Sequence, residues 1–130
     1  MTGKKQTLII HARLPSRNEA ENKARTHWSC GASLKKDATQ LVALCAKQQK
    51  IAPYSGRVRL NCSFFEPNKK RDADNVFAGV KYILDGLVQA GVLPNDSRKY
   101  VEEIAFAVKV DKQNPRVEVE IGEEENHDNT

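Results

Sequence analysis

Alternation of apolar and polar residues predicts four β-strands in this chain. Residues 6–12 (QTLIIHA) are an aliphatic, β-branched run, and residues 57–66 (RVRLNCSFFE) place an apolar side chain at every second position. Residues 99–110 and 116–121 are the third and fourth strands, and Asn114-Pro115 forms the turn between them. We expect these last two strands to pair as a hairpin.

Helical periodicity appears in two further segments. A helix capped by Ser33 is predicted to run to about Gln49, and a second helix from about Asn75 to Ala90 ends at Gly91. Residues 13–33 show no sustained period and are interpreted as a long ordered loop. The resulting order, β-α-β-α-β-β, predicts an α+β fold, a two-layer sandwich of a small mixed sheet and two helices.

Length and charge indicate one domain with a polyanionic partner. The chain has 130 residues, so residues 1–121 are expected to form one domain, and the acidic tail 122–130 is expected to be disordered. Residues 1–121 contain all 21 Lys and Arg against 13 acids, a net charge of +8. Nucleic acid is the commonest partner of so basic a body, although solubility alone would also explain the charge.

The cysteines and the N-terminus predict a cytoplasmic protein. The three cysteines, Cys30, Cys45 and Cys62, form no CxxC pair, so neither a zinc ribbon nor a disulfide framework fits. No signal-peptide core and no long apolar segment is present, so we expect the protein to be neither secreted nor membrane-spanning.

Acidic residues around the second predicted helix could form a metal site. Asp72 and Asp74 in KKRDADN share a face of extended backbone, and Asp96 follows the helix in the turn to the third strand. Mg²⁺ prefers carboxylate oxygens completed by phosphate and water, and bound metal ions promote phosphodiester hydrolysis. Lys81, on the helix, could stabilise the charge that develops on the phosphoryl group.

Ordinary structural roles also explain these residues. Asp-x-Asp-Asn before a helix is a favourable N-cap, and Lys81 with Asp85 is a common i,i+4 surface pair. Asp96 after Pro-Asn is a typical turn residue. The spacing alone leaves both interpretations open.

Cations beside the acids are candidates for binding a DNA backbone. Lys69, Lys70 and Arg71 run directly into the acidic pair. The predicted loop adds a second group of cations and one tryptophan: Arg17, Lys23, Arg25 and Trp28. Trp28 could stack on a base, but we favour its packing against the core as an anchor of the loop.

The segment RDADN-x5-K-x3-DGLVQAGVLPNDS resembles the RusA family of Holliday-junction resolvases. The family pattern is Asp-x-Asp-Asn, a lysine on the following helix, an Asp-Ala/Gly-Leu and a later aspartate. The match is close from Arg71 to Ser97, and Leu14-Pro15-Ser16-x-Asn18 is similar to the Leu-Pro-x-Asn region of the family. The predicted order of helices and strands over residues 6–121 also agrees with that of the family.

The resemblance implies roles for individual residues. Asp72, Asp74 and Asp96 would bind Mg²⁺, for which Mn²⁺ could substitute, and would form the catalytic set together with Lys81. Asn75 and Asp85 would not bind the metal but would help to hold the catalytic residues in place. One position departs from the family: its best-known members have the lysine four residues after the second acid, where this chain has Ala78.

The predicted function is therefore metal-dependent resolution of four-way DNA junctions in recombination and repair. Members of the family are homodimers that cut two opposed strands, which implies a homodimer here. Two alternatives remain: a non-catalytic DNA-binding module on the same scaffold, which the displaced lysine favours, and a nuclease that cuts flaps or forks.

Overall fold

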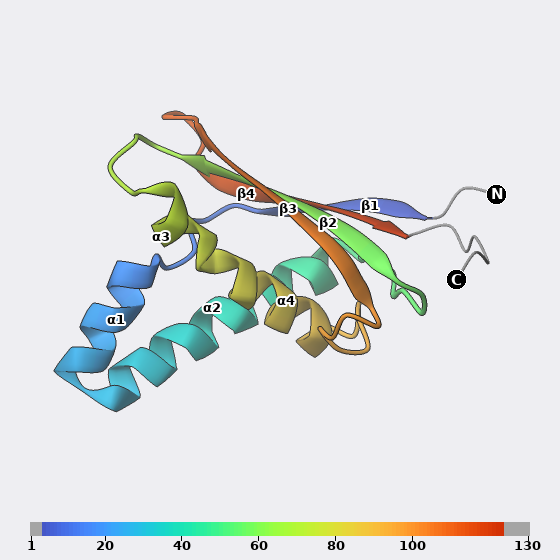
Figure 1. Cartoon of the computed structure of the whole chain (residues 1–130), viewed down its shortest axis with the longest axis horizontal. Coiled ribbons are helices and arrows are strands. Elements are labelled where there is room, and N and C mark those ends of the chain that lie inside the picture. The colour runs from blue at the N-terminus through green and yellow to red at the C-terminus, as the bar shows by residue number, and fades with distance from the viewer. Residues whose placement is uncertain (1–3, 124–130) are drawn as a thin grey trace.

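A four-stranded mixed β-sheet carries its helices on one face (Figure 1). The computed structural model describes residues 4–123. The strands are β1 (Lys5–Ile10), β2 (Val58–Glu66), β3 (Val101–Val110) and β4 (Arg116–Glu123). The helices are α1 (Arg17–Thr26), α2 (Trp28–Gln48), α3 (Ala73–Phe77) and α4 (Gly79–Gln89). This arrangement confirms the predicted α+β class and the two layers. The last residues of the predicted tail, 124–130, lie outside the described residues.

The order of the strands is β1-β4-β2-β3, so the predicted hairpin between β3 and β4 is wrong. β3 pairs with β2 in parallel, whereas β4 lies on the other side of β2 and is antiparallel to both β2 and β1. The chain therefore crosses the end of β2 between β3 and β4. The backbone N–H of Asp111 donates to the carbonyl of Glu66 at 2.8 Å, and Arg116 bonds the Asp111 carboxylate at 2.8 Å, which fixes this crossing.

Residues 13–33 are mainly helical, so the predicted loop is also wrong. Ser16 caps α1 in a capping box with Glu19, and His27 caps α2, which begins well before the predicted Ser33 cap. α1 contains no buried residue, so no apolar stripe marks it in the sequence. Within residues 4–123, no helix is long and apolar enough to cross a membrane.

The second predicted helix is divided into α3 and α4 at Ala78. Gly79 begins α4 where a Cβ atom would lie 2.9 Å from the Phe64 ring and 3.2 Å from Leu14 Cβ. The missing side chain lets the start of α4 approach β2 closely. Gly91 follows the end of α4 with φ of 79°, the left-handed conformation that glycine adopts readily.

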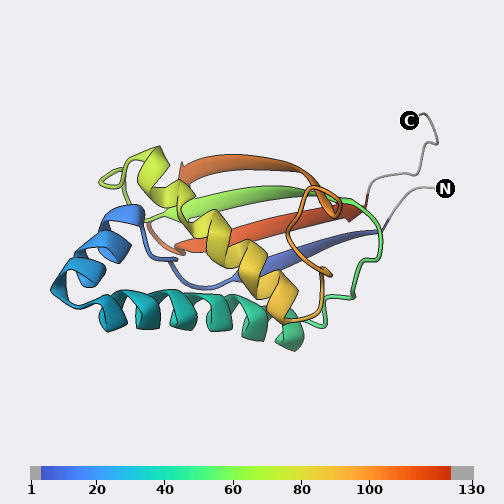
Figure 2. The ribbon, with the colours of Figure 1, turned by 60° about the horizontal axis from the view of Figure 1, so that its bottom comes forward.

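α2 and α4 pack side by side beneath the sheet (Figure 2). Val42 of α2 is fully buried, as are Ile83 and Leu87 of α4 and the inward-facing residues of the central strands. Cys62 of β2 lies in the same core, and burial raises the pKa of its thiol to about 12. All three cysteines are free.

Gly86→Ala is expected to lower the free energy of unfolding by about 1–3 kcal/mol, because overpacking forces the core to shift. A Cβ atom at Gly86 would lie 2.5 Å from Val42 Cβ and 3.0 Å from the carbonyl oxygen of Thr39. Chemical denaturation measures the change. Gly122→Ala is the control, since its Cβ would meet nothing within 4 Å. Equal stability of both variants would contradict this tight helix contact.

Candidate active site

Lys81 of α4 joins two of the predicted acidic residues. Its Nζ donates to Asp96 Oδ2 at 2.9 Å and lies 3.0 Å from Asp85 Oδ1. Asp85 is one helical turn further along α4, and Asp96 lies in the turn before β3. The turn is braced by the backbone N–H of Ser97, which donates to Asn95 Oδ1 at 2.8 Å.

Mutual attraction shifts the pKa values of Lys81 and Asp96 in opposite directions. The hydrogen bond that Lys81 donates to Asp96, followed by the one that it donates to Asp85, raises the pKa of Lys81. The bond from Lys81 lowers the pKa of Asp96. Lys81 is therefore a stable cation across the neutral range, suited to stabilising negative charge rather than to accepting a proton.

Asp72 and Asp74 lie together at the start of α3. Asp72 is the N-cap residue with extended backbone, yet its side chain makes no capping hydrogen bond. Asp74 follows in the first helical turn, and both residues are exposed. Two neighbouring exposed carboxylates, one of them at a cap position that it does not fill, are a donor set that fits a hard cation completed by phosphate and water.

Asp96 does not lie next to Asp72 and Asp74 in the single chain. Because β2 and β3 run parallel, the segment that follows β2 and the segment that precedes β3 are attached at opposite ends of the strand pair. In the described part of the chain, no group of three or more His, Cys, Asp and Glu side chains could hold a metal ion. A single copy therefore presents one carboxylate pair and, separately, the Lys81–Asp85–Asp96 cluster.

A buried carboxylate that sequence analysis missed organises the segment before Asp72. Glu66, at the end of β2, is only 3% exposed. Arg13 donates to its Oε1 at 2.6 Å, and the Arg71 guanidinium lies 3.5 Å from the same oxygen. Arg71 also donates to the carbonyl of Leu14 at 3.2 Å and to the carboxylate of Glu19. The sequence could have indicated that Glu66 is buried, because Glu66 occupies an inward position in the alternation of β2.

Asn75 links α3 to α1. Its Oδ1 accepts a hydrogen bond from the backbone N–H of Asn18 at 3.2 Å. This contact holds the start of α1 against the helix that carries Asp74.

The predicted DNA-binding cations differ in how strongly they are held. Arg71 is the least exposed, since its guanidinium bonds acids and a carbonyl of the same chain. On α1, Arg17 and Arg25 lie 3.1 and 4.0 Å from the Glu21 carboxylate. Lys69 and Lys70 are exposed in the turn that leads to Asp72, and Lys23 is exposed on α1.

Trp28 does not anchor this region to the core, so that interpretation is wrong. It is 75% exposed at the start of α2, and its ring stacks on His27 with 6.2 Å between the ring centroids. An exposed tryptophan beside the cations of α1 leaves base stacking as the remaining role considered from the sequence.

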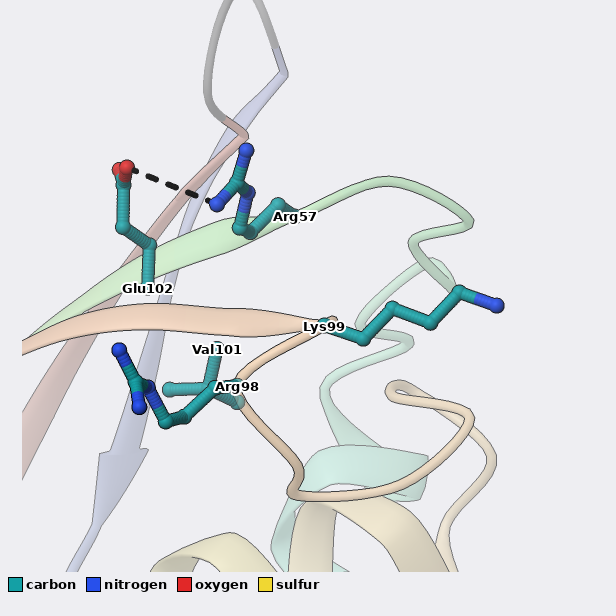
Figure 3. A pocket seen from close by; sticks show the side chains of 5 residues that line it. All are labelled: Arg57, Arg98, Lys99, Val101 and Glu102. Atoms are coloured by element: carbon teal, nitrogen blue, oxygen red, sulfur yellow. Dashed lines mark ion pairs between the residues drawn. The ribbon is translucent and has the colours of Figure 1, made fainter. Parts of the chain in front are cut away.

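A basic hollow of about 460 Å³ opens near Asp96 at the start of β3 (Figure 3). It is lined by Arg57, Arg98, Lys99, Val101 and Glu102. Glu102 Oε1 lies 3.9 Å from Arg57 Nη1, and Figure 3 shows Lys99 extending away from this ion pair. Arg98 and Lys99 directly follow Ser97 in the Asp96 turn, and neither was predicted from the sequence as a DNA-binding residue.

Comparison with known protein families decides the identity of this fold. The model of the family described as Endodeoxyribonuclease RusA matches residues 14–122, which is most of the chain. The chain belongs to the RusA endodeoxyribonuclease family. A comparison with curated proteins found no match.

Membership confirms the resemblance that the aspartate motif indicated. The RusA family comprises Holliday-junction resolvases, so the chain is assigned to nucleases that act on branched DNA. The match includes α1, α3, α4 and the Asp96 turn. The roles of individual residues in this RusA-family chain stay predictions.

Lys81→Met is expected to raise the pKa of Asp96 towards that of an ordinary aspartate, because the variant removes the hydrogen bond that lowers it. A carboxyl with a lowered folded-state pKa stabilises the fold above its unfolded pKa, and this contribution is lost as pH falls through the folded value. The pair is exposed, so the contribution is no more than about 1 kcal/mol. Carboxyl NMR titration measures the shift. Lys36→Met is the control, and an unchanged Asp96 pKa in Lys81→Met would contradict the pairing.

Arg71→Ala is expected to lower the free energy of unfolding by about 1–3 kcal/mol, because it removes one charged hydrogen bond to the buried Glu66 and two more, to Glu19 and to the Leu14 carbonyl. Lys70→Ala, one residue earlier and exposed, should change stability by less than about 0.5 kcal/mol. Urea denaturation compares the two. If both variants were equally stable, Arg71 would not have the structural role described here.

Proposed function

We propose that this RusA-family chain is a metal-dependent homodimeric nuclease that resolves four-way DNA junctions by paired cuts. The observation that carries the proposal is the pair of exposed carboxylates at Asp72 and Asp74, beside the exposed Lys69 and Lys70, in a member of an endodeoxyribonuclease family. The Asp72 side chain makes no hydrogen bond to the start of the helix that it precedes. Acids that could hold a metal and cations that could hold phosphate thus share one short segment.

Asp72 and Asp74 would hold Mg²⁺, and Mn²⁺ could replace it. Such an ion, when bound, polarises a phosphoryl oxygen and lowers the pKa of a bound water. Asp96 is proposed as the third acid of the set, although its carboxylate faces Lys81 in the single chain. Asn75 would keep the start of α3 in place, and Asp85 would help to orient Lys81.

Lys81 would act as a positive charge. Its raised pKa keeps the ammonium protonated, so it can stabilise the negative charge of the pentavalent phosphoryl group but is a poor general base. Asp85 and Asp96 fix the position of Nζ with two contacts near 3 Å. The lysine lies one helical turn beyond Ala78, the position at which the family motif places it.

The DNA backbone would follow the exposed cations. Lys69 and Lys70 lie next to the acidic pair, and Arg17, Lys23 and Arg25 lie on α1. Arg71 belongs to the predicted set as well, but its contacts with Glu66 and Glu19 favour a positioning role. Binding should weaken steeply as salt rises, because phosphate contacts release counterions.

A non-catalytic junction-binding protein is the second candidate. Two observations favour it: Ala78 stands where the family motif has lysine, and no single-chain cluster of three acids is present within residues 4–123. A nuclease for flaps or forks would use the same residues and differ only in the DNA that it prefers.

Cleavage of a synthetic immobile four-way junction tests these proposals. The protein is incubated with the junction, with duplex and with a flap, each in Mg²⁺, in Mn²⁺ and in chelator. Symmetric nicks that require metal and the junction would support the resolvase. Binding without cleavage in either metal would favour the binding protein, and cleavage of flaps alone would favour the third alternative.

Asp74→Asn is expected to reduce cleavage by on the order of 10²–10³-fold or more, because it removes a charge from the metal site. Junction binding should be unchanged or tighter, since the substitution also removes repulsion between the acid and the DNA. Gel cleavage and gel-shift assays measure the two effects. Asp37→Asn, the same change on an exposed residue of α2, is the control. Cleavage by Asp74→Asn at the wild-type rate would rule out this site.

A further inference from the structure

β3 is a long edge strand. It has ten residues and is last in the strand order of the sheet that residues 4–123 form, with β2 as its neighbour there. An edge strand presents backbone N–H and C=O groups that can pair with another strand, and proteins usually protect such edges with charge, short length or a covering segment.

Apolar side chains follow this edge on the face that bears the helices. Ile104, Phe106 and Val108 are in register with inward-facing residues of β2, yet Ile104 is exposed and the other two are only partly buried. Ile104 is 36% exposed, and Val110 at the end of the stripe is 49% exposed. Phe77 of α3 is 48% exposed and packs edge-to-face on Phe106, with 4.9 Å between centroids. The strand edge and an uncovered apolar surface therefore coincide.

The charges on the other face of β3 are self-complementary. Glu103 and Lys109 are exposed and lie three residues on either side of Phe106. When two copies of β3 pair antiparallel about a two-fold axis at Phe106, Glu103 of each copy is directly opposite Lys109 of the other. The same register places Ile104 opposite Val108, and Phe106 opposite its own copy.

Neighbouring registers lack this match. Centring the axis on Ala107 would place Glu103 opposite Asp111, two like charges. Centring it on Ala105 would place Glu103 opposite Ala107 and Lys109 opposite Val101, so no ion pair would form. Of these three registers, the one at Phe106 alone gives two cross-strand ion pairs together with apolar pairs on the other face.

We infer that a second copy of this chain docks along β3, so that the two sheets join into one across a two-fold axis at Phe106. The inference rests on the proposed homodimer and names the surface that forms it. A symmetric pair of identical edges satisfies both strands at once, and neither copy is left with this edge open.

A charge-swap series tests the register. Glu103→Lys alone and Lys109→Glu alone each create two like-charge pairs, so each is expected to weaken the dimer about ten-fold or more. The double variant restores opposite charges and should recover the wild-type dissociation constant. Mixing the two single variants should give a heterodimer, because every pair across the axis is then again opposite in sign. Sedimentation equilibrium measures association, and circular dichroism checks folding.

Lys5→Glu is the matched control, since it makes the same charge change on β1 at the other edge of the sheet. It should leave the dimer unchanged. A dimeric wild type whose association survives both single variants would overturn the β3 surface and leave the homodimer standing. A monomeric wild type would overturn both, while metal-dependent junction cleavage would still test the nuclease separately.

Discussion

The Glu66 carboxylate is the point on which the placement of the candidate site depends. It is buried at the end of β2, where an unpaired charge would be costly, and two arginines from different segments compensate it. Arg71, the second of these, stands immediately before Asp72 and also reaches the segment after β1 and the start of α1. One buried negative charge thereby fixes where the chain turns from β2 into α3, and with it the direction from which Asp72 and Asp74 meet solvent.

The parallel pairing of β2 and β3 has a second effect on the site. It requires a crossover, in which α3 and α4 lie beneath the sheet, and the crossover carries the acidic pair near its beginning and Asp96 between the end of α4 and the start of β3. Lys81 lies between them on α4 and bonds the later acid. The residues of the family motif are thus divided between a carboxylate pair and a lysine-centred cluster, although they follow one another closely in sequence.

Much of this fold could be predicted from local patterns. The inward positions of β2 and the apolar stripe of α4 are strong periodic signals, and both elements lie where they were expected.

α1 was missed because its stability comes from a capping box and from surface ion pairs, which leave no apolar period. The predicted hairpin was wrong because the turn between β3 and β4 does not determine whether the two strands pair with each other or, as here, on opposite sides of β2. The inward position of Glu66 was readable from the alternation of β2, but its partners Arg13 and Arg71 come from two other segments, and no local pattern specifies that they meet there. The motif residues were recognised, but the distances among them depend on the crossover, which no short pattern specifies.

The lack of any buried side chain in α1 bears on how the protein moves. A helix held by a cap, by Arg71 and by the close approach of Ala24 to Gly31 can open at a free-energy cost well below that of global unfolding. Its amides should therefore exchange with solvent sooner than those of α4, whose apolar stripe is buried. Arg17, Lys23 and Arg25 would then be carried by a helix that can be reshaped at low cost against a curved or branched polyanion, while the Glu66 carboxylate at the end of β2 still holds Arg71, the residue before Asp72.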